Sequence, residues 1–391
     1  MKRFPESLSS KLALRSESNS VRKLPIQIST IDFASNDYLG LAQSETIFKE
    51  THAYLIQNNY LQNGATGSRL LSGNHKLYQE TEDYIAQFHQ SETALIFNSG
   101  YDANLGFFSS VPQRNDIILY DELSHASIRD GISLSNAKAY KFNHNDFEDL
   151  EHKIIKFKKE IQENKSVLYI VTESVFSMDG DCPNLEELVQ LSERCGCYLV
   201  VDEAHALGVF GSAEISGGEG LVQMLGIQNQ VFARIMTFGK GLGCHGAAIL
   251  GTEELKSYLI NFARSFIYTT GLPPHSIATI LQSYHYLAKE KQAIENLKAN
   301  IVHFNREKIV LGLKPIFIYS KSAIQSAIIP GNKKVKAIAK QLQEKGFEVK
   351  AILSPTVPEG QERLRFCLHS YNSETEISTV LQLLSELVFK S

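Results

Sequence analysis

Short runs of apolar residues recur along the chain and are separated by longer amphipathic stretches. Six runs rich in β-branched and aromatic residues lie at 94–98, 116–120, 167–174, 198–205, 234–239 and 246–251. Stretches such as 76–89 and 184–195 carry apolar residues at helical spacing. The pattern therefore predicts strands that alternate with helices.

The apolar runs are continuous rather than alternating with polar residues, and this predicts the kind of sheet. Strands without a polar face are stable where helices cover both faces of the sheet, as in parallel sheets. We therefore expect an α/β fold with a mostly parallel, doubly wound central sheet.

The pattern changes after about residue 276. A long helical segment is followed by predicted strands at 322–329 and 363–369 and by predicted helices at 335–346 and 373–389. These elements are typical of a smaller α+β domain. We predict three parts: an N-terminal segment at 1–45 that packs with the small domain, a large domain at 46–275 and a small α+β domain at 276–391.

Composition narrows the class of protein. Of 391 residues, 43% are hydrophobic and 21% are charged, with a net charge of −4, so a polybasic nucleic-acid partner is not expected. The chain has no run of eighteen apolar residues and no apolar targeting segment at its start, so we expect a cytoplasmic protein without a membrane partner. Its five cysteines include no C-x-x-C pair, so neither a disulfide framework nor a metal site is expected.

Polar residues that directly follow an apolar run are candidates for chemistry, because doubly wound sheets bind ligands at the carboxyl ends of their strands. Ser99, Gly100 and Tyr101 follow the first run and open a predicted helix. The free N–H groups at such a helix start suit a phosphate. The alternative is an ordinary helix cap.

Asp202 and His205 follow a strongly apolar strand, which predicts a carboxylate and an imidazole with little water around them. The letters DEAH also occur in NTPases, but those need a G-x-x-x-x-G-K-[ST] phosphate loop, and this sequence has none. A salt-bridged acid beside a hydrogen-bonded histidine is the structural alternative.

Lys240 lies between glycines after another apolar strand. A desolvated lysine has a lowered pKa and can form a Schiff base. The glycines 241, 243 and 246 match G-x-G-x-x-G, but an apolar strand follows them instead of a helix, which disfavours a dinucleotide site. An acid, a lysine and a glycine-led helix start together suit pyridoxal 5'-phosphate (PLP).

An ordered set of motifs covers nearly the whole chain and resembles the α-oxoamine synthases. The motifs are NDYLGL (36–41), GATGSRLLSGN (64–74), FNSGYDANLG (97–106), DELSHASIRDG (121–131), ESVFSMDGD (173–181), VDEAHALGVFG (201–211), TFGKGLG (237–243), YTTGLPP (268–274), SPTVPEG (354–360) and RLRFCL (363–368). The resemblance implies the type I PLP fold and a homodimer with shared active sites. It also implies condensation of an amino acid with an acyl thioester, with loss of carbon dioxide.

The resemblance assigns roles around the cofactor ring. Lys240 matches the lysine that holds PLP and removes the α-proton of the amino acid, and Asp202 matches the partner of the ring nitrogen. His125 matches the histidine that stacks on the ring and meets the substrate. Ser177 and His205 match groups that bond near the phenolic oxygen. The catalytic residues implied are Lys240, His125, Asp202 and His205.

For the phosphate, the resemblance implies the backbone of Gly100 and Tyr101 and the hydroxyl of Thr237. Thr269 and Thr270 match residues that reach the phosphate of the partner subunit. A complete site would then require the dimer.

For the substrate, the resemblance implies that Arg365 holds the amino-acid carboxylate and that Asn36 assists. Strand alternation puts Arg363 on the same face as Arg365, so periodicity alone does not choose between them. Arg22 and Thr356 match further substrate positions. For Arg22, a solvated surface arginine is the alternative.

The overall resemblance implies L-alanine and a pimeloyl thioester as substrates, giving 8-amino-7-oxononanoate for biotin synthesis. Sister enzymes that use glycine or serine are the alternative: 2-amino-3-ketobutyrate ligase, 5-aminolevulinate synthase and serine palmitoyltransferase. Local motifs hardly separate them. The sequence also leaves open whether the acyl group arrives on coenzyme A or on an acyl carrier protein.

Overall fold

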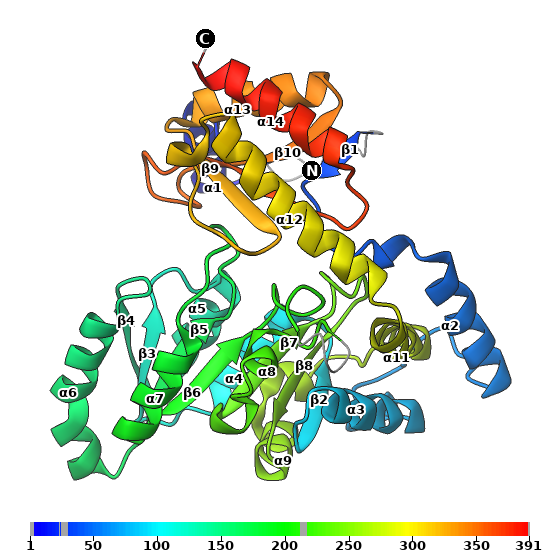
Figure 1. Ribbon diagram of the computed structural model, residues 1–391. Coiled ribbons are helices and arrows are strands. Elements are labelled where there is room, and N and C mark those ends of the chain that lie inside the picture. The colour runs from blue at the N-terminus through cyan, green and yellow to red at the C-terminus, as the bar shows by residue number, and fades with distance from the viewer. Residues whose placement is uncertain (1–3, 23, 25–29, 212–216, 390–391) are drawn as a thin grey trace. The chain divides into compact units, whose positions relative to one another are not determined.

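The computed structural model describes residues 4–22, 24, 30–211 and 217–389. The chain forms two compact units, each with its own sheet (Figure 1). The large unit comprises residues 36–177 and 182–295, and the small unit comprises 1–35, 178–181 and 296–391. The two units are defined by how the residues pack together. The predicted division into domains at residues 45 and 275 stays a prediction.

The large unit is built on a seven-stranded sheet with the order β2-β8-β7-β6-β5-β3-β4. Strands β3 to β7 run parallel, and β8 is antiparallel to both of its neighbours. The predicted mostly parallel sheet is confirmed. Its strands are β2 (Thr93–Phe97), β3 (Ile117–Asp121), β4 (Lys138–Phe142), β5 (Leu168–Glu173), β6 (Tyr198–Asp202), β7 (Ala233–Thr237) and β8 (Ala247–Gly251).

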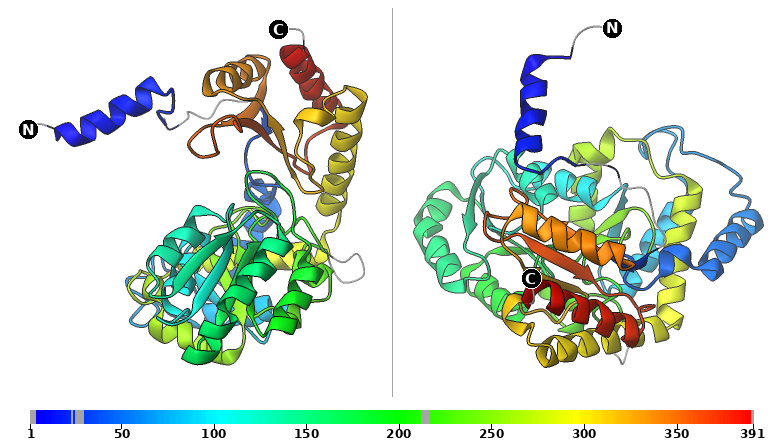
Figure 2. Two further views of the ribbon diagram at one scale, coloured as in Figure 1. Left: turned by 90° about the vertical axis from the view of Figure 1, so that its left-hand side faces the viewer. Right: turned by 90° about the horizontal axis from the view of Figure 1, so that it is seen from above.

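Helices cover both faces of this sheet (Figure 2). Successive side chains of a strand point to opposite faces. On β3, Ile118 joins the core under one set of helices, whereas Ile117 and Leu119 join the core under the other. The first set is α4 (Gly100–Ser110), α5 (Ala126–Ser133), α9 (Glu253–Phe262) and α10 (Arg264–Ile267), and the second is α6 (Phe147–Asn164), α7 (Leu185–Cys195) and α8 (Leu221–Met224). Because helices cover both faces of the sheet, its strands are apolar on both sides, which explains their continuous apolar runs.

Three further helices complete the large unit at the β2 end. Helix α11 (Pro274–Lys289) packs against both α2 (Glu45–Gln57) and α3 (Lys76–Phe88). Short 3-10 turns lie at η1 (Leu41–Gln43) and η2 (Gln228–Gln230).

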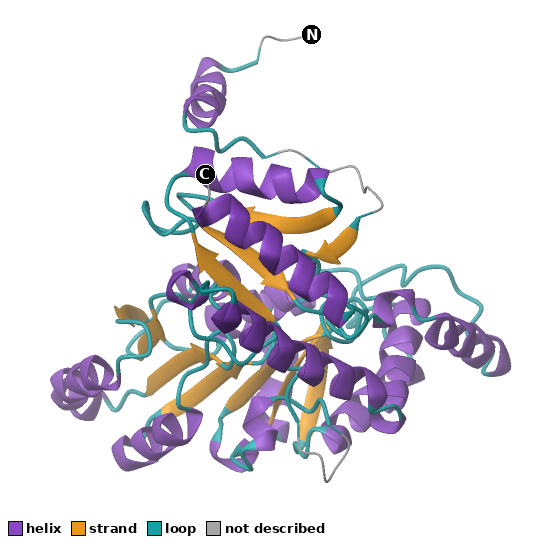
Figure 3. Cartoon of the chain, turned by 45° about the horizontal axis from the view of Figure 1, so that its top comes forward, coloured by secondary structure: helices purple, strands orange, loops and turns teal. Residues whose placement is uncertain are grey.

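The small unit has a four-stranded sheet with the order β1-β10-β11-β9 (Figure 3). Only the β1 to β10 pairing is parallel among these strands. Helix α13 packs against β10 and against α14. The elements are α1 (Glu6–Glu17), β1 (Ile31–Phe33), the last part of α12 (Gln292–Val310), η3 (Lys314–Ile316), β9 (Ile324–Ile328), α13 (Asn332–Glu344), β10 (Phe347–Ile352), β11 (Arg363–Cys367) and α14 (Glu374–Phe389).

Within the described ranges, no helix is long and apolar enough to cross a membrane. All five cysteines are free thiols, and Cys195 is exposed.

Candidate active site

The carboxyl ends of the central strands bring the predicted cofactor residues to one edge of the large sheet. Asp202 is the last residue of β6, and Lys240 follows β7. The two loops approach closely, because a Cβ atom added at Gly241 would lie 2.2 Å from the carbonyl oxygen of Leu207. A glycine beside Lys240 therefore allows the lysine loop to contact the loop that carries His205.

Lys240 belongs to a line of polar contacts through the large unit. Its Nζ lies 2.8 Å from Nε2 of His205, and Nδ1 of His205 lies 2.7 Å from the hydroxyl of Tyr38. That hydroxyl donates to Oδ1 of Asn36 at 3.2 Å. Tyr38 is fully buried and His205 nearly so. If the Lys240 ammonium donates to Nε2, the imidazole carries its proton on Nδ1 and donates it to Tyr38.

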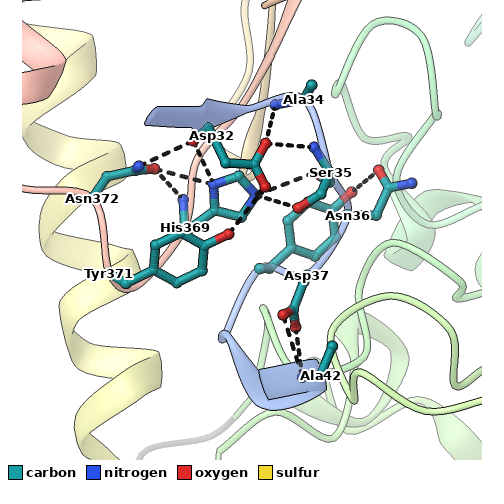
Figure 4. A network of polar contacts seen from close by, with 10 residues as sticks. Asp32, Ala34, Ser35, Asn36, Asp37, Ala42, His369, Tyr371 and Asn372 are labelled. Atoms are coloured by element: carbon teal, nitrogen blue, oxygen red, sulfur yellow. Dashed lines mark hydrogen bonds and ion pairs between the residues drawn. The ribbon is translucent and has the colours of Figure 1, made fainter. Parts of the chain in front are cut away.

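Figure 4 shows the turn that leads into Asn36. Oδ1 of Asp32 accepts hydrogen bonds from the backbone N–H groups of Ala34 at 2.7 Å and Ser35 at 2.9 Å. The carbonyl oxygen of Asp32 lies 3.1 Å from Nδ1 of His369 and accepts a hydrogen bond from Asn372 at 3.1 Å. These contacts tie the end of β1 to the segment after β11.

Asp202 is held with both carboxylate oxygens engaged. Nδ2 of Asn104, on α4, donates to Oδ2 at 2.8 Å, and the backbone N–H of Ala204 donates to Oδ1 at 2.9 Å. The side chain is buried, with 5% of the residue exposed. A buried carboxylate in fixed orientation is suited to stabilise a protonated ring nitrogen.

His125 precedes α5 and is fixed from two directions. Its Nδ1 lies 2.7 Å from the hydroxyl of Ser127, which accepts from Asn104 at 3.0 Å. The backbone N–H of His125 donates to Oε1 of Glu173 at 2.6 Å. Burial and the neighbouring negative charge of Asp202 raise the pKa of Glu173 to about 8. Asn104 therefore links the Asp202 carboxylate to the histidine predicted to stack on the ring.

The predicted phosphate cup lies at the start of α4. The hydroxyl of Ser99 caps the helix by accepting from the backbone N–H of Asp102 at 3.1 Å. A Cβ atom added at Gly100 would lie 2.3 Å from Oγ1 of Thr237, so only glycine permits this approach. The prediction that residues 99–101 open a helix is confirmed. The Tyr101 side chain turns to Asp130, to which its hydroxyl donates at 2.5 Å.

Thr269 and Thr270 lie beside this cup within the same chain. Nδ2 of Asn98 donates to Oγ1 of Thr269 at 3.0 Å and to the carbonyl oxygen of Thr270 at 2.7 Å. Their predicted reach to a partner subunit stays a prediction. Ser177 lies after β5, at the same edge of the sheet.

These residues fit PLP by the chemistry of their donors and acceptors. The capped start of α4, with Gly100 against Thr237, offers backbone N–H groups suited to a phosphate. Buried Asp202 offers a carboxylate for a ring N–H, and Lys240 offers an amine. His125, Asp202, His205, Thr237 and Lys240 all belong to the large unit.

The predicted substrate residues other than Asn36 and His125 belong to the small unit. Arg363 forms an ion pair with Asp179, and its Nε donates to the carbonyl oxygen of Gln361 at 2.9 Å. Arg365 lies on the same strand, β11, opposite Lys350 and Ser326. The ion pair gives Arg363 a structural role, which periodicity could not predict.

Arg22 and Thr356 line one cavity of about 530 Å³ in the small unit. Both residues are exposed. The structure brings this predicted pair together, although its contact with substrate stays a prediction.

Four residues in these networks were not singled out by sequence reasoning: Tyr38, Asn104, Ser127 and Glu173. All four lie inside the quoted motifs NDYLGL, FNSGYDANLG, DELSHASIRDG and ESVFSMDGD. The motifs were therefore the signal in the sequence that could have pointed to these four residues. Their roles depend on contacts between segments that are distant in the chain.

Comparison with known proteins agrees with this site. The profile of the family "Aminotransferase class I and II" matches residues 28–384. The 8-amino-7-oxononanoate synthase of Emericella nidulans is 39% identical over 97% of this chain and 95% of its own length.

Solved structures are similar over most of the chain. An 8-amino-7-oxononanoate synthase from Francisella tularensis has a TM-score of 0.76 and 31% identity, covering 92% of this chain and 98% of that one. A structure of SPT (serine palmitoyltransferase) with PLP has a TM-score of 0.88 and 25% identity, covering 99% of this chain and 98% of that one. The predicted fold class and cofactor are confirmed.

The family match also removes the NTPase alternative. The chain belongs to the aminotransferase class I and II family, and the members that it resembles identify it as a PLP-dependent acyltransferase.

Proposed function

We propose that this chain condenses L-alanine with a pimeloyl thioester to give 8-amino-7-oxononanoate, carbon dioxide and a free thiol, in biotin synthesis. A bond forms between the α-carbon of alanine and the acyl carbon, while the thioester C–S bond breaks and the alanine carboxylate leaves as carbon dioxide. The similarity to 8-amino-7-oxononanoate synthases along nearly the whole chain supports this choice of substrates.

The observation that carries the chemistry is the contact of Lys240 with His205 at 2.8 Å, at the strand ends that also hold Asp202. PLP, when bound, withdraws electrons from the α-carbon of the amino acid. The carboxylate of Asp202 holds a proton at the ring nitrogen. The hydrogen bond from Asn104 keeps this carboxylate oriented. The amine of Lys240 takes the α-proton of the amino acid. The contact with Nε2 of His205 holds the lysine side chain in one orientation.

Substrate binding is assigned to Arg365 and Asn36, which hold the carboxylate of the amino acid. Arginine suits this task because its guanidinium binds a carboxylate through two parallel hydrogen bonds. Arg363 is engaged by Asp179 and Gln361, which supports the choice of Arg365 over Arg363. Arg22 and Thr356, which share a cavity, are assigned to further substrate contacts.

A sister activity, the condensation of L-serine with a palmitoyl thioester, is the second candidate. It is favoured by the TM-score of 0.88 with the SPT structure, against 0.76 with the F. tularensis synthase. Sequence identity favours the F. tularensis synthase, which is 31% identical, whereas the SPT structure is 25% identical. Identity follows pocket chemistry more directly than backbone shape does, so we keep alanine as the main proposal.

The test pairs each amino acid with each acyl donor. Purified holoenzyme is mixed with alanine, glycine or serine and with pimeloyl, acetyl, succinyl or palmitoyl thioesters, on coenzyme A and on a carrier protein. Carbon dioxide release and product mass are followed, with the Lys240→Ala chain as the blank. Alanine with pimeloyl thioester should be fastest, and glycine should react less well, because one methyl group gives only about 1–3 kcal/mol of discrimination. A faster reaction of serine with palmitoyl thioester, or of glycine with a short thioester, would overturn the substrate assignment.

A further inference from the structure

The small unit carries an apolar groove of about 600 Å³ along one face of α12. Several of its lining residues are three or four positions apart on the helix, so they share one face: Lys298, Ile301, Val302, Asn305, Lys308 and Ile309. Phe317 and Tyr319 line the groove from the segment that follows. Its volume is in the range of small-molecule sites.

Three apolar residues of the groove are open to solvent, whereas Ile301 and Phe317 are buried. Val302 is 68% exposed, Ile309 is 58% exposed and Tyr319 is 71% exposed. Neighbouring exposed apolar side chains of this kind often mark a ligand or interaction site.

The charged residues of the groove are all of one sign. Lysines 298, 308, 314 and 321 line it, and no acidic residue does. Among the described residues, none of these four lysines forms an ion pair, although the chain as a whole carries a net charge of −4. The groove therefore combines apolar surface with positive charge that lacks a counter-ion.

Lys308 is the buried member of this set. It is only 5% exposed, and its Nζ donates to Oε1 of Gln325 at 3.0 Å and lies 5.3 Å from the ring centroid of Phe317. Gln325 is held in turn, because its Nε2 donates to the carbonyl oxygen of Ser322 at 3.0 Å. Burial and the nearby charge of Lys314 lower the pKa of Lys308 to about 8. A buried ammonium held by a neutral amide is stabilised when an anion reaches it.

We propose that this groove binds an amphipathic carboxylate, whose aliphatic chain lies on Val302, Ile309 and Tyr319 and whose carboxylate pairs with the ammonium of Lys308. The aliphatic chain would cover apolar surface that is now exposed. The carboxylate would supply the counter-charge that Lys308 lacks among the described residues. None of the groove residues belongs to the set assigned to the proposed reaction, so the inference does not rest on that reaction.

The test uses decanoate as the probe, below its critical micelle concentration, in calorimetric titration of the full chain. Decanol supplies the same aliphatic chain without the charge, and acetate supplies the charge without the chain. Decanoate should bind at one site per chain, and both controls should bind far more weakly. Equal binding of decanol and decanoate, or no binding of decanoate, would overturn the proposal.

Two variants place the bound probe. Lys308→Met keeps an unbranched apolar stem without the ammonium and should weaken decanoate binding about tenfold, because a charge-assisted hydrogen bond is lost. Ile309→Glu changes an exposed position, so folding is retained, and its carboxylate should repel the probe. Lys333→Met, at an exposed lysine of α13 outside the groove, is the matched control and should bind decanoate normally.

The variants also distinguish the possible failures. Unchanged binding in Lys308→Met and Ile309→Glu would mean that decanoate binds at another place, which contradicts the proposal. If Lys308→Met fails to fold, Ile309→Glu alone decides: loss of binding supports the groove, and unchanged binding overturns it.

Discussion

Tyr38 connects the N-terminal part of the large unit to Lys240. Its hydroxyl meets Nδ1 of His205 at 2.7 Å, on the opposite side of the imidazole from the lysine. We infer that Tyr38 is a positioning residue, because it fixes which nitrogen of His205 carries the proton.

Tyr38→Phe should keep the fold, since the buried ring remains, while turnover falls about tenfold through loss of one partner of a buried imidazole. The pH at which the absorbance of the bound cofactor changes should also move, which a purely structural effect would not produce. Tyr60→Phe, at a half-buried tyrosine, is the control. An unaltered absorbance profile in Tyr38→Phe would refute the positioning role.

Glu173 supplies a pH dependence with a definite sign. Its pKa rises from 4.5 to about 8 through burial and the neighbouring charge of Asp202. The folded chain therefore keeps a proton that the unfolded chain releases, so this group lowers the free energy of unfolding as pH rises from about 4.5 to about 8.

Glu173→Gln should remove that contribution in the cofactor-free protein, because the amide can still accept from the backbone N–H of His125 but does not titrate. Urea unfolding at several pH values between 5 and 9 measures the difference from wild type. Glu186→Gln, at an exposed position of α7, should follow wild type. Parallel curves for wild type and Glu173→Gln would show that Glu173 is already ionised in the folded chain.

The contacts that complete the site were beyond sequence reasoning for a physical reason. Lys240 could be predicted because a lysine between glycines at a strand end is unusual. Tyr38 reads as an ordinary buried aromatic, and its partner His205 lies 167 residues away in the chain. Only the fold brings the two together.

At the scale of elements, helix α4 combines a structural and a binding role. Ser99→Ala removes the cap hydrogen bond and should lower the free energy of unfolding by about 1 kcal/mol. It should also weaken PLP binding, because the first turn of α4 would no longer hold its N–H groups in place.

Asn184→Ala is the matched control, because Asn184 caps α7 in the same way, by accepting from the backbone N–H of Glu187. It should cost similar stability in denaturant unfolding and leave the dissociation constant of PLP unchanged. Equal PLP affinities in the two variants would show that the α4 cap does not support the phosphate.

Sequence reasoning found six of the seven strands of the large sheet but not β4, and in the small sheet it did not find β10. Strand β4 lies at the sheet edge, where Lys138 and Lys141 are exposed, so its sequence has no apolar run. Strand β10 mixes apolar and charged residues, including Glu348 and Lys350. Exposed and half-exposed strands are recognised from their neighbours more than from their own residues.

At the scale of the whole molecule, we predict a homodimer in which Thr269 and Thr270 serve the partner's phosphate site. The prediction is tested by co-expressing Lys240→Ala chains with chains that carry Thr269→Val and Thr270→Val. If the threonines act across the dimer, each mixed dimer contains one intact site, and activity should recover. Neither parent alone should be active.

Recovery requires the threonines to act in trans. If they act within their own chain, beside Asn98, both sites of the mixed dimer are damaged. The mixture would then be no more active than its parents, and the dimer would not be needed to complete the site.

The central claim is that Lys240 holds the cofactor. The measurement is borohydride reduction of the yellow holoenzyme followed by proteolysis and mass spectrometry of the peptides. The account predicts the reduced cofactor on the peptide that contains Lys240, and no covalent attachment in the Lys240→Ala chain. Recovery of the cofactor on a different lysine, or unchanged attachment in Lys240→Ala, would contradict it.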